Sequence, residues 1–118
     1  MYEHIEIKVK TMPTAKGGGR KVTPVMVASL YGVSIDDLFA EKRGGARAAF
    51  ARQVAMYLMH VVYGIRMSDV ASAFGRHPST VAHACHRMED LRDDPQLDCH
   101  LTQLEDLLRT ATGIEATI

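Results

Sequence analysis

The sequence lacks tryptophan, and it contains two cysteines, Cys85 and Cys99, among its 118 residues. Two cysteines are too few for a disulfide scaffold, so we expect a reduced protein. No run of about 18 apolar residues is present, which leaves no candidate for a transmembrane helix. The first residues also lack the basic and then apolar pattern of a signal peptide. These absences predict one ordinary domain in the cytoplasm.

Signals for catalysis and for cofactors are missing as well. The sequence has no GxxxxGK[ST] run of the kind that cradles nucleotide phosphates. His83, Cys85 and His86 lie close together, but helical periodicity turns Cys85 inward and His83 outward, which separates the possible metal ligands. No carboxylate pair and no Ser-His-Asp order indicates a reaction centre. We therefore expect no enzyme activity, no metal, no cofactor and no bound nucleotide.

The net charge is zero, because 14 Lys and Arg residues balance 14 Asp and Glu residues, but the charges are unevenly distributed. Residues 42–88 contain seven basic side chains and one acidic side chain. Residues 89–118 contain two basic and eight acidic side chains. The middle of the chain could therefore face a polyanion while the C-terminal part is turned away from it. Two solvated faces of opposite sign would give the same pattern.

The N-terminal 22 residues differ from the rest of the chain. Residues 2–10 alternate apolar and polar side chains, as a β-strand does. We expect a short strand or arm there, which could pair with a second copy to form a homodimer, pack on the domain or stay loose. Thr11–Lys21, with its Gly17–Gly19 run, is typical of a flexible basic linker.

Residues 23–112 have a helical pattern, and residues 113–118 form a tail. Thr23 and Pro24 are a favourable helix start, and Ser34 can cap a short second helix. The longest predicted helix is Ala46–Tyr63, with apolar residues at spacings of three and four. A last amphipathic helix follows Asp93 and carries four leucines on one face. The pattern predicts an all-α domain.

The segment from Met67 to Arg92 predicts a helix-turn-helix. Ser68 caps a short helix, a tight turn containing Gly75 follows, and Pro78 begins a longer helix. In such a motif the second helix lies in the major groove of DNA. Periodicity predicts that the following residues face outward on it: Ser79, Thr80, Ala82, His83, His86 and Arg87. An ordinary pair of packed helices would have the same spacing.

Four segments make the pattern more specific. They are Tyr31–Leu38 (YGVSIDDL), Arg52–Leu58 (RQVAMYL), Ala73–Arg76 (AFGR) and Ser79–Cys85 (STVAHAC). With these in register, Val27–Arg92 resembles the C-terminal DNA-binding domain of the bacterial replication initiator DnaA. The resemblance implies a helix-turn-helix fold of the DnaA C-terminal, Trp-repressor-like type, here as a stand-alone protein without the ATPase domain of the initiator.

The resemblance also implies which residues contact DNA. His77 and Pro78 stand where the family reads bases with Asp and His, and Gly44 stands where the family inserts an arginine into the minor groove. Cys85 falls on a buried position. The implied contacts to phosphates and bases are Lys42, Arg43, Arg47, Arg52, Gln53, Arg76, His77, Pro78, Ser79, Thr80, His83 and Arg87.

We therefore expect a sequence-specific protein that binds double-stranded DNA in the bacterial nucleoid and regulates transcription by occupying its site. Two alternatives remain open. One is a modulator of DNA replication that competes for DnaA-type sites. The other is a protein-interaction module that has kept the fold and lost DNA binding.

Overall fold

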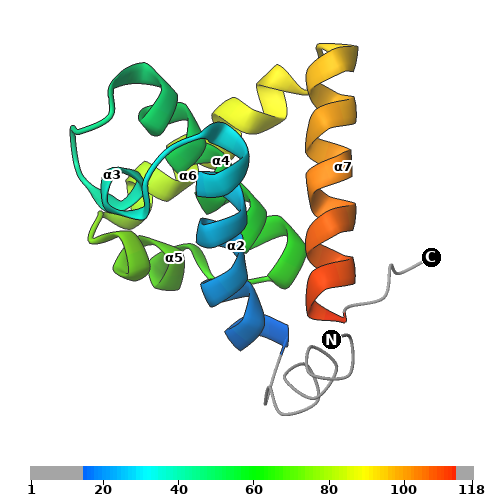
Figure 1. The fold of residues 1–118 in the computed structure, drawn as a ribbon, viewed down its shortest axis with the longest axis horizontal. Helices are drawn as coiled ribbons and strands as arrows, with labels where there is room; N and C mark the ends of the chain where they lie inside the picture. Colours follow the sequence, from blue (N-terminus) through cyan, green and yellow to red (C-terminus); the bar gives the residue numbers. More distant parts are fainter. Residues whose placement is uncertain (1–14, 114–118) are drawn as a thin grey trace.

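The computed structural model describes residues 15–113, which form six α-helices and no β-strand (Figure 1). The helices are α2 (Ala15–Tyr31), α3 (Ile35–Phe39), α4 (Gly45–Tyr63), α5 (Met67–Phe74), α6 (Pro78–Leu91) and α7 (Pro95–Thr112). The predicted all-α fold is confirmed. The strand and homodimer contact predicted for residues 2–10 lie outside the described residues, as do residues 114–118. No helix within residues 15–113 is long and apolar enough to cross a membrane.

Helix α4 is the centre of the fold. Its residues from Val54 to Met59 are all buried, because α2, α6, α5 and α7 pack around it. A helix surrounded on several sides needs apolar residues on more than one face, which explains the nearly continuous apolar sequence of α4. Figure 1 shows α2 crossing in front of α4 and α6, with α7 standing beside them at the right edge.

Side chains cap three of the helices. Ser34 caps α3, His77 caps α6 and Asp94 caps α7, and each accepts a hydrogen bond from a backbone N–H of the first turn. The sequence correctly predicts the Ser34 cap. The prediction for Ser68 is wrong, since the cap position of α5 is occupied by Arg66, two residues earlier, without a side-chain bond.

The predicted flexible linker is wrong for residues 15–21. Helix α2 begins at Ala15 instead of Thr23, runs through the glycines and contains Pro24 in its interior. Close packing explains this: a Cβ atom added at Gly19 would lie 2.4 Å from the ring of Tyr63 on α4. The absence of a side chain therefore lets α2 approach α4, and this packing outweighs the low helix propensity of glycine.

The Gly19→Ala variant is expected to be less stable by about 1–2 kcal/mol. Alanine gains about 1 kcal/mol of helix propensity, but overpacking costs about 1–3 kcal/mol, and the upper part of that range applies where the neighbour cannot move. The Tyr63 ring is held in place, because its hydroxyl donates to the carbonyl of Leu108 at 3.1 Å and lies 3.2 Å from Oγ1 of Thr112. Urea unfolding of Gly19→Ala and of Ser29→Ala, an exposed site on α2, would check this. Equal stability of the two variants would contradict it.

The two cysteines have different environments, and Cys85 lies on the buried face, as expected. Burial and the negative charge of Glu89 raise the pKa of the Cys85 thiol to about 11. Cys99 is exposed on α7. Because the thiolate is the reactive form, we expect iodoacetamide near pH ~8 to modify Cys99 and spare Cys85 in the folded protein. Mass spectrometry with and without urea measures this, and rapid native labelling of Cys85 would contradict it.

An ionic network joins the end of α6 to α7. The guanidinium of Arg92 donates to Asp98 at 2.6 Å, to Glu105 at 2.8 Å and to the hydroxyl of Tyr57 at 3.1 Å. Burial by itself would lower the pKa of Arg92, but these hydrogen bonds raise it. The network uses part of the acidic charge of the C-terminal region to fix α7 against α6. It therefore has a structural role at the end of α6 that is remote from the helix-turn-helix turn.

Candidate nucleic-acid interface

Helices α5 and α6 form the expected helix-turn-helix. The turn between them begins at Gly75, whose φ of +64° is favourable for glycine, and the N–H of Arg76 closes the turn on the carbonyl of Ala71 at 2.8 Å. Pro78 occupies the first turn of α6, where its missing N–H costs no hydrogen bond. The sequence thus sets both the end of α5 and the start of α6.

One face of α6 is open. Val81, Ala84, Cys85 and Met88 are buried against the core. The residues predicted to face outward are all exposed: Ser79, Thr80, Ala82, His83, His86 and Arg87. These residues have hydroxyl, imidazole and guanidinium groups, and the acids of α6, Glu89 and Asp90, are exposed only in its last turn. The chemistry of this open face suits the phosphates and base edges of DNA.

The exposed residue His77 presents a hydrogen-bond donor at the start of α6. Its Nδ1 accepts the backbone N–H of Ser79 at 3.1 Å and lies 2.9 Å from the Ser79 hydroxyl. A backbone N–H can only donate, so Nδ1 must be the acceptor, and the neutral ring then has its proton on Nε2. The cap therefore selects the tautomer that leaves Nε2–H for an external acceptor. Pro78 is exposed beside it.

Arg87 on α6 is oriented by two residues of α4. One of its terminal nitrogens donates to Oε1 of Gln53 at 2.6 Å, and its guanidinium lies over the ring of Phe50, 5.7 Å from the ring centroid. Arg87 remains exposed. Gln53 and Arg87, predicted as separate DNA contacts, thus form one unit. The sequence did not predict that Phe50 orients Arg87, because an aromatic residue on a predicted apolar stripe indicates core packing.

The structure gives Arg52 a different environment from the one predicted. Its side chain is only 6% exposed. Nε donates to the carbonyl of Leu38 at 2.7 Å, and a terminal nitrogen donates to the carbonyl of Asp37 at 2.8 Å. Burial and the positive charge of Arg76 lower the pKa of Arg52. This geometry is that of an internal brace and does not match the prediction of a contact to the DNA backbone.

Arg76 connects the helix-turn-helix to the region after α3. A terminal nitrogen of Arg76 donates to the carbonyl of Ala40 at 2.9 Å, and the residue is partly exposed. Arg52 and Arg76 therefore bind three carbonyls of the Asp37–Ala40 segment between them. These bonds hold the start of the α3–α4 loop next to the α5–α6 turn.

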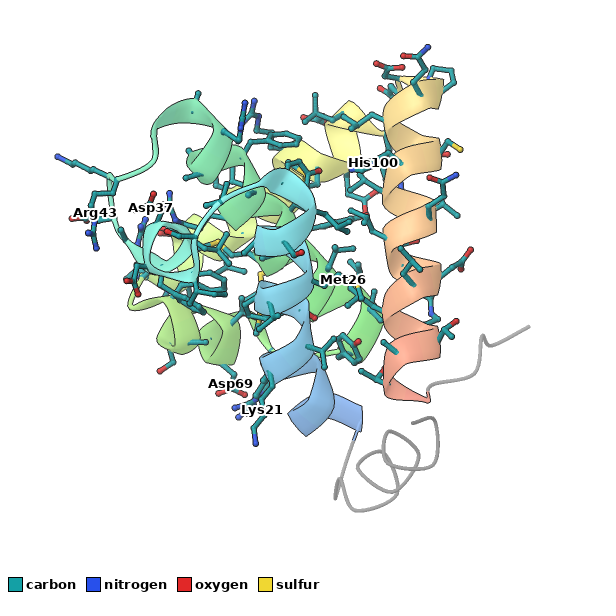
Figure 2. The ribbon with its side chains drawn as sticks, in the orientation of Figure 1. Lys21, Met26, Asp37, Arg43, Asp69 and His100 are labelled. Atoms are coloured by element: carbon teal, nitrogen blue, oxygen red, sulfur yellow. The ribbon has the colours of Figure 1, made fainter. Side chains whose placement is uncertain are left out.

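The α3–α4 loop carries exposed basic residues. Lys42 and Arg43 on this loop and Arg47 in the first turn of α4 are all exposed, and Arg43 forms a weak pair with Asp37 at 4.0 Å. Gly44 has a φ of +87°, and a Cβ atom there would lie 2.4 Å from the Cβ of Ala48, so the turn into α4 requires glycine. Figure 2 shows Arg43 and Asp37 at the left edge of the molecule, opposite α7. The basic loop and the acidic last helix are therefore on opposite sides.

The described residues contain no metal centre. Within residues 15–113, no three His, Cys, Asp or Glu side chains are grouped closely enough to hold a metal ion. His100, for example, lies 2.9 Å from the hydroxyl of Tyr31 and edge-on to its ring.

Comparison with known proteins gives one consistent result. The family model described as "Bacterial dnaA protein helix-turn-helix" matches residues 24–88. The chromosomal replication initiator protein DnaA of Acholeplasma laidlawii is 35% identical over 95 residues, which cover 79% of this chain and 21% of that protein. The DnaA of Levilactobacillus brevis is 33% identical over 106 residues, which cover 86% of this chain and 23% of that protein.

The chain spans about a fifth of the length of these relatives. No solved structure matches it. The family match extends from α2 through most of α6, and it includes α5, the turn and α6 as far as Met88. Because the match covers more than half of the chain, this protein belongs to the bacterial DnaA helix-turn-helix family.

Proposed function

We propose that this protein binds double-stranded DNA with a sequence preference and regulates transcription by occupying its site. The observation that carries the proposal is the exposed face of α6 from Ser79 to Arg87, which is lined by hydrogen-bond donors and has no acid before Glu89 in the last turn of the helix. The family match supports DNA binding. In this arrangement α6 lies in the major groove with its N-terminal residues at the base edges. The site of action is the cytoplasm, where bacterial DNA lies.

The proposed contacts fall into two groups. Phosphates are bound by side chains that surround the base-reading residues, and each positive side chain adds to the affinity and to its salt dependence. Bases are read from the α5–α6 turn and the first turn of α6. The proposed phosphate contacts are Lys42, Arg43, Arg47, Gln53, His83 and Arg87. The proposed base contacts are Arg76, His77, Pro78, Ser79 and Thr80.

We assign Arg52 to a positioning role. Its bonds to the carbonyls of Asp37 and Leu38 leave it turned into the protein, and the same segment leads directly into the basic loop. Arg52 would therefore act on DNA binding by placing Lys42 and Arg43.

The test is selection of binding sites from random duplex DNA, followed by measurement of affinity against salt concentration. One enriched motif, together with a steep fall of log affinity with log salt, supports the proposal. Equal weak binding to all sequences contradicts the sequence preference. No binding at low salt contradicts DNA binding and favours a protein-interaction module.

The Arg87→Ala variant tests the phosphate contact. We expect the slope of log affinity against log salt to decrease by about one unit, with similar losses on all sequences. Arg87→Lys keeps the charge and should keep the slope, although it loses the bond to Gln53 and the stacking on Phe50. Arg109→Ala, on α7, is the matched control and should leave the slope unchanged. If Arg87→Ala had the same slope as the wild type, Arg87 would not contact a phosphate.

A second candidate is modulation of replication by competition for DnaA sites. It is favoured by the similarity of this chain to proteins named as chromosomal replication initiators. Footprinting of the selected motif with this protein and with a full-length DnaA distinguishes the two candidate functions. Mutual displacement of this protein and a full-length DnaA from one motif supports competition, whereas a motif that DnaA ignores supports the transcriptional role.

A further inference from the structure

Helix α2 exposes large apolar side chains on its outer side, beside the polar Lys21 and Ser29. Val27 and Ala28 are buried against the core, whereas Val25 is 59% exposed and Leu30 is 54% exposed on the outside. A helix at the surface of a single domain usually has a polar outer face, and a helix that is apolar on all sides is usually covered. The outer side of α2 therefore has the composition of an interface.

The apolar surface continues onto α7. Leu107 is 50% exposed there, and Met26 lies between α2 and α7 (Figure 2). Two hollows of about 440 and 600 Å³ share Met26 in their lining. The α2–α7 face consists of the residues that line these hollows: Lys21, Val22, Val25, Met26, Ser29, Leu30, Gln103, Asp106, Leu107, Thr110 and Ala111. None of the proposed DNA contacts belongs to it, so it is a separate surface.

The charges on this face are few and opposite. Lys21 on α2 and Asp106 on α7 are its charged residues, and both are exposed, although Asp106 also lies 3.7 Å from Arg109 of its own helix. Such a face offers little to a strongly charged partner. The face is complementary to the same face of a second copy. A two-fold axis through it can bring Lys21 of each copy to Asp106 of the other, and the apolar residues between them then pack together.

We propose that the α2–α7 face is the contact between two copies of this chain. The dimer is isologous, with α2 of each copy against α7 of the other. Val25, Leu30 and Leu107 are covered in it, and exposed apolar patches of this kind mark protein contacts. The DNA-binding face of each copy stays open.

The experiment is sedimentation equilibrium of the full chain between about 1 and 500 µM. We expect a reversible monomer–dimer equilibrium. Leu107→Asp should weaken it at least about tenfold, because a charge would be buried without a partner. Val61→Asp is the matched control, since Val61 is another exposed apolar residue, on α4 outside the face, and it should leave the equilibrium unchanged. Circular dichroism confirms that each variant is folded.

A charge exchange tests the geometry. Lys21→Glu and Asp106→Lys should each weaken the dimer about three- to tenfold, because a two-fold dimer contains the pair twice. The double variant should restore the association. A protein that is monomeric over the whole range overturns the proposal and leaves the face to a different partner. A dimer that Leu107→Asp does not weaken also overturns it, because the contact then lies elsewhere.

Discussion

The Arg52→Ala variant is expected to lose about 3 kcal/mol of unfolding free energy. The guanidinium donates two hydrogen bonds to the carbonyls of Asp37 and Leu38 from a buried position. Removal of a charged donor costs about 1.5–3 kcal/mol for each hydrogen bond of this type. The carbonyl of Leu38 loses its donor, whereas that of Asp37 keeps the N–H of Ala40 at 3.3 Å. A loss of this size is a large fraction of the stability of a small domain.

Urea unfolding and salt-dependent DNA binding together decide the role of Arg52. Folded Arg52→Ala should lose stability and also part of the salt slope, because the segment that places Lys42 and Arg43 is no longer braced. Arg47→Ala is the matched control: Arg47 is exposed on the same helix, so this variant should keep its stability and lose about one unit of slope. If Arg52→Ala had unchanged stability and a lower slope of log affinity against log salt, Arg52 would contact DNA directly.

The sequence could not predict the environment of Arg52. Periodicity places Arg52 beside the buried Ala51 and Val54, at the margin of the apolar stripe, where an arginine is usually exposed. Its burial depends on α3, whose last carbonyls lie close to α4 and accept the hydrogen bonds of Arg52. The packing of α3 against α4 depends on tertiary structure, and no pattern in the sequence near Arg52 predicts it.

The outward residues of α6 could be predicted because local signals agree there. Pro78 sets the start of the helix, and its apolar residues repeat at spacings of three and four, so only one face can point inward. The same logic failed for the start of α2. Three consecutive glycines predict a linker, but Gly19 is needed for contact with Tyr63 on α4, and a contact distant in sequence cannot be read from composition.

Ala82 is the position where a single change should most strongly affect DNA binding without affecting the fold. It is exposed in the middle of the open face of α6, between the first turn and His83, and it is the smallest side chain there. In the proposed complex it allows the helix to approach the groove closely. Glutamate favours helices, so Ala82→Glu should fold with nearly the stability of the wild type.

We expect Ala82→Glu to weaken DNA binding at least about 100-fold. The longer side chain occupies the space that the groove would fill, and its negative charge faces phosphates, a juxtaposition that costs several kcal/mol. Gln96→Glu, which adds the same charge to an exposed residue of α7, should change affinity only slightly, because long-range repulsion is screened within about 10 Å in ordinary buffer. Fluorescence anisotropy with the selected DNA site measures both variants. Equal affinity of the two variants would show that α6 does not enter the groove, and the interface would then have to be sought on the basic α3–α4 loop.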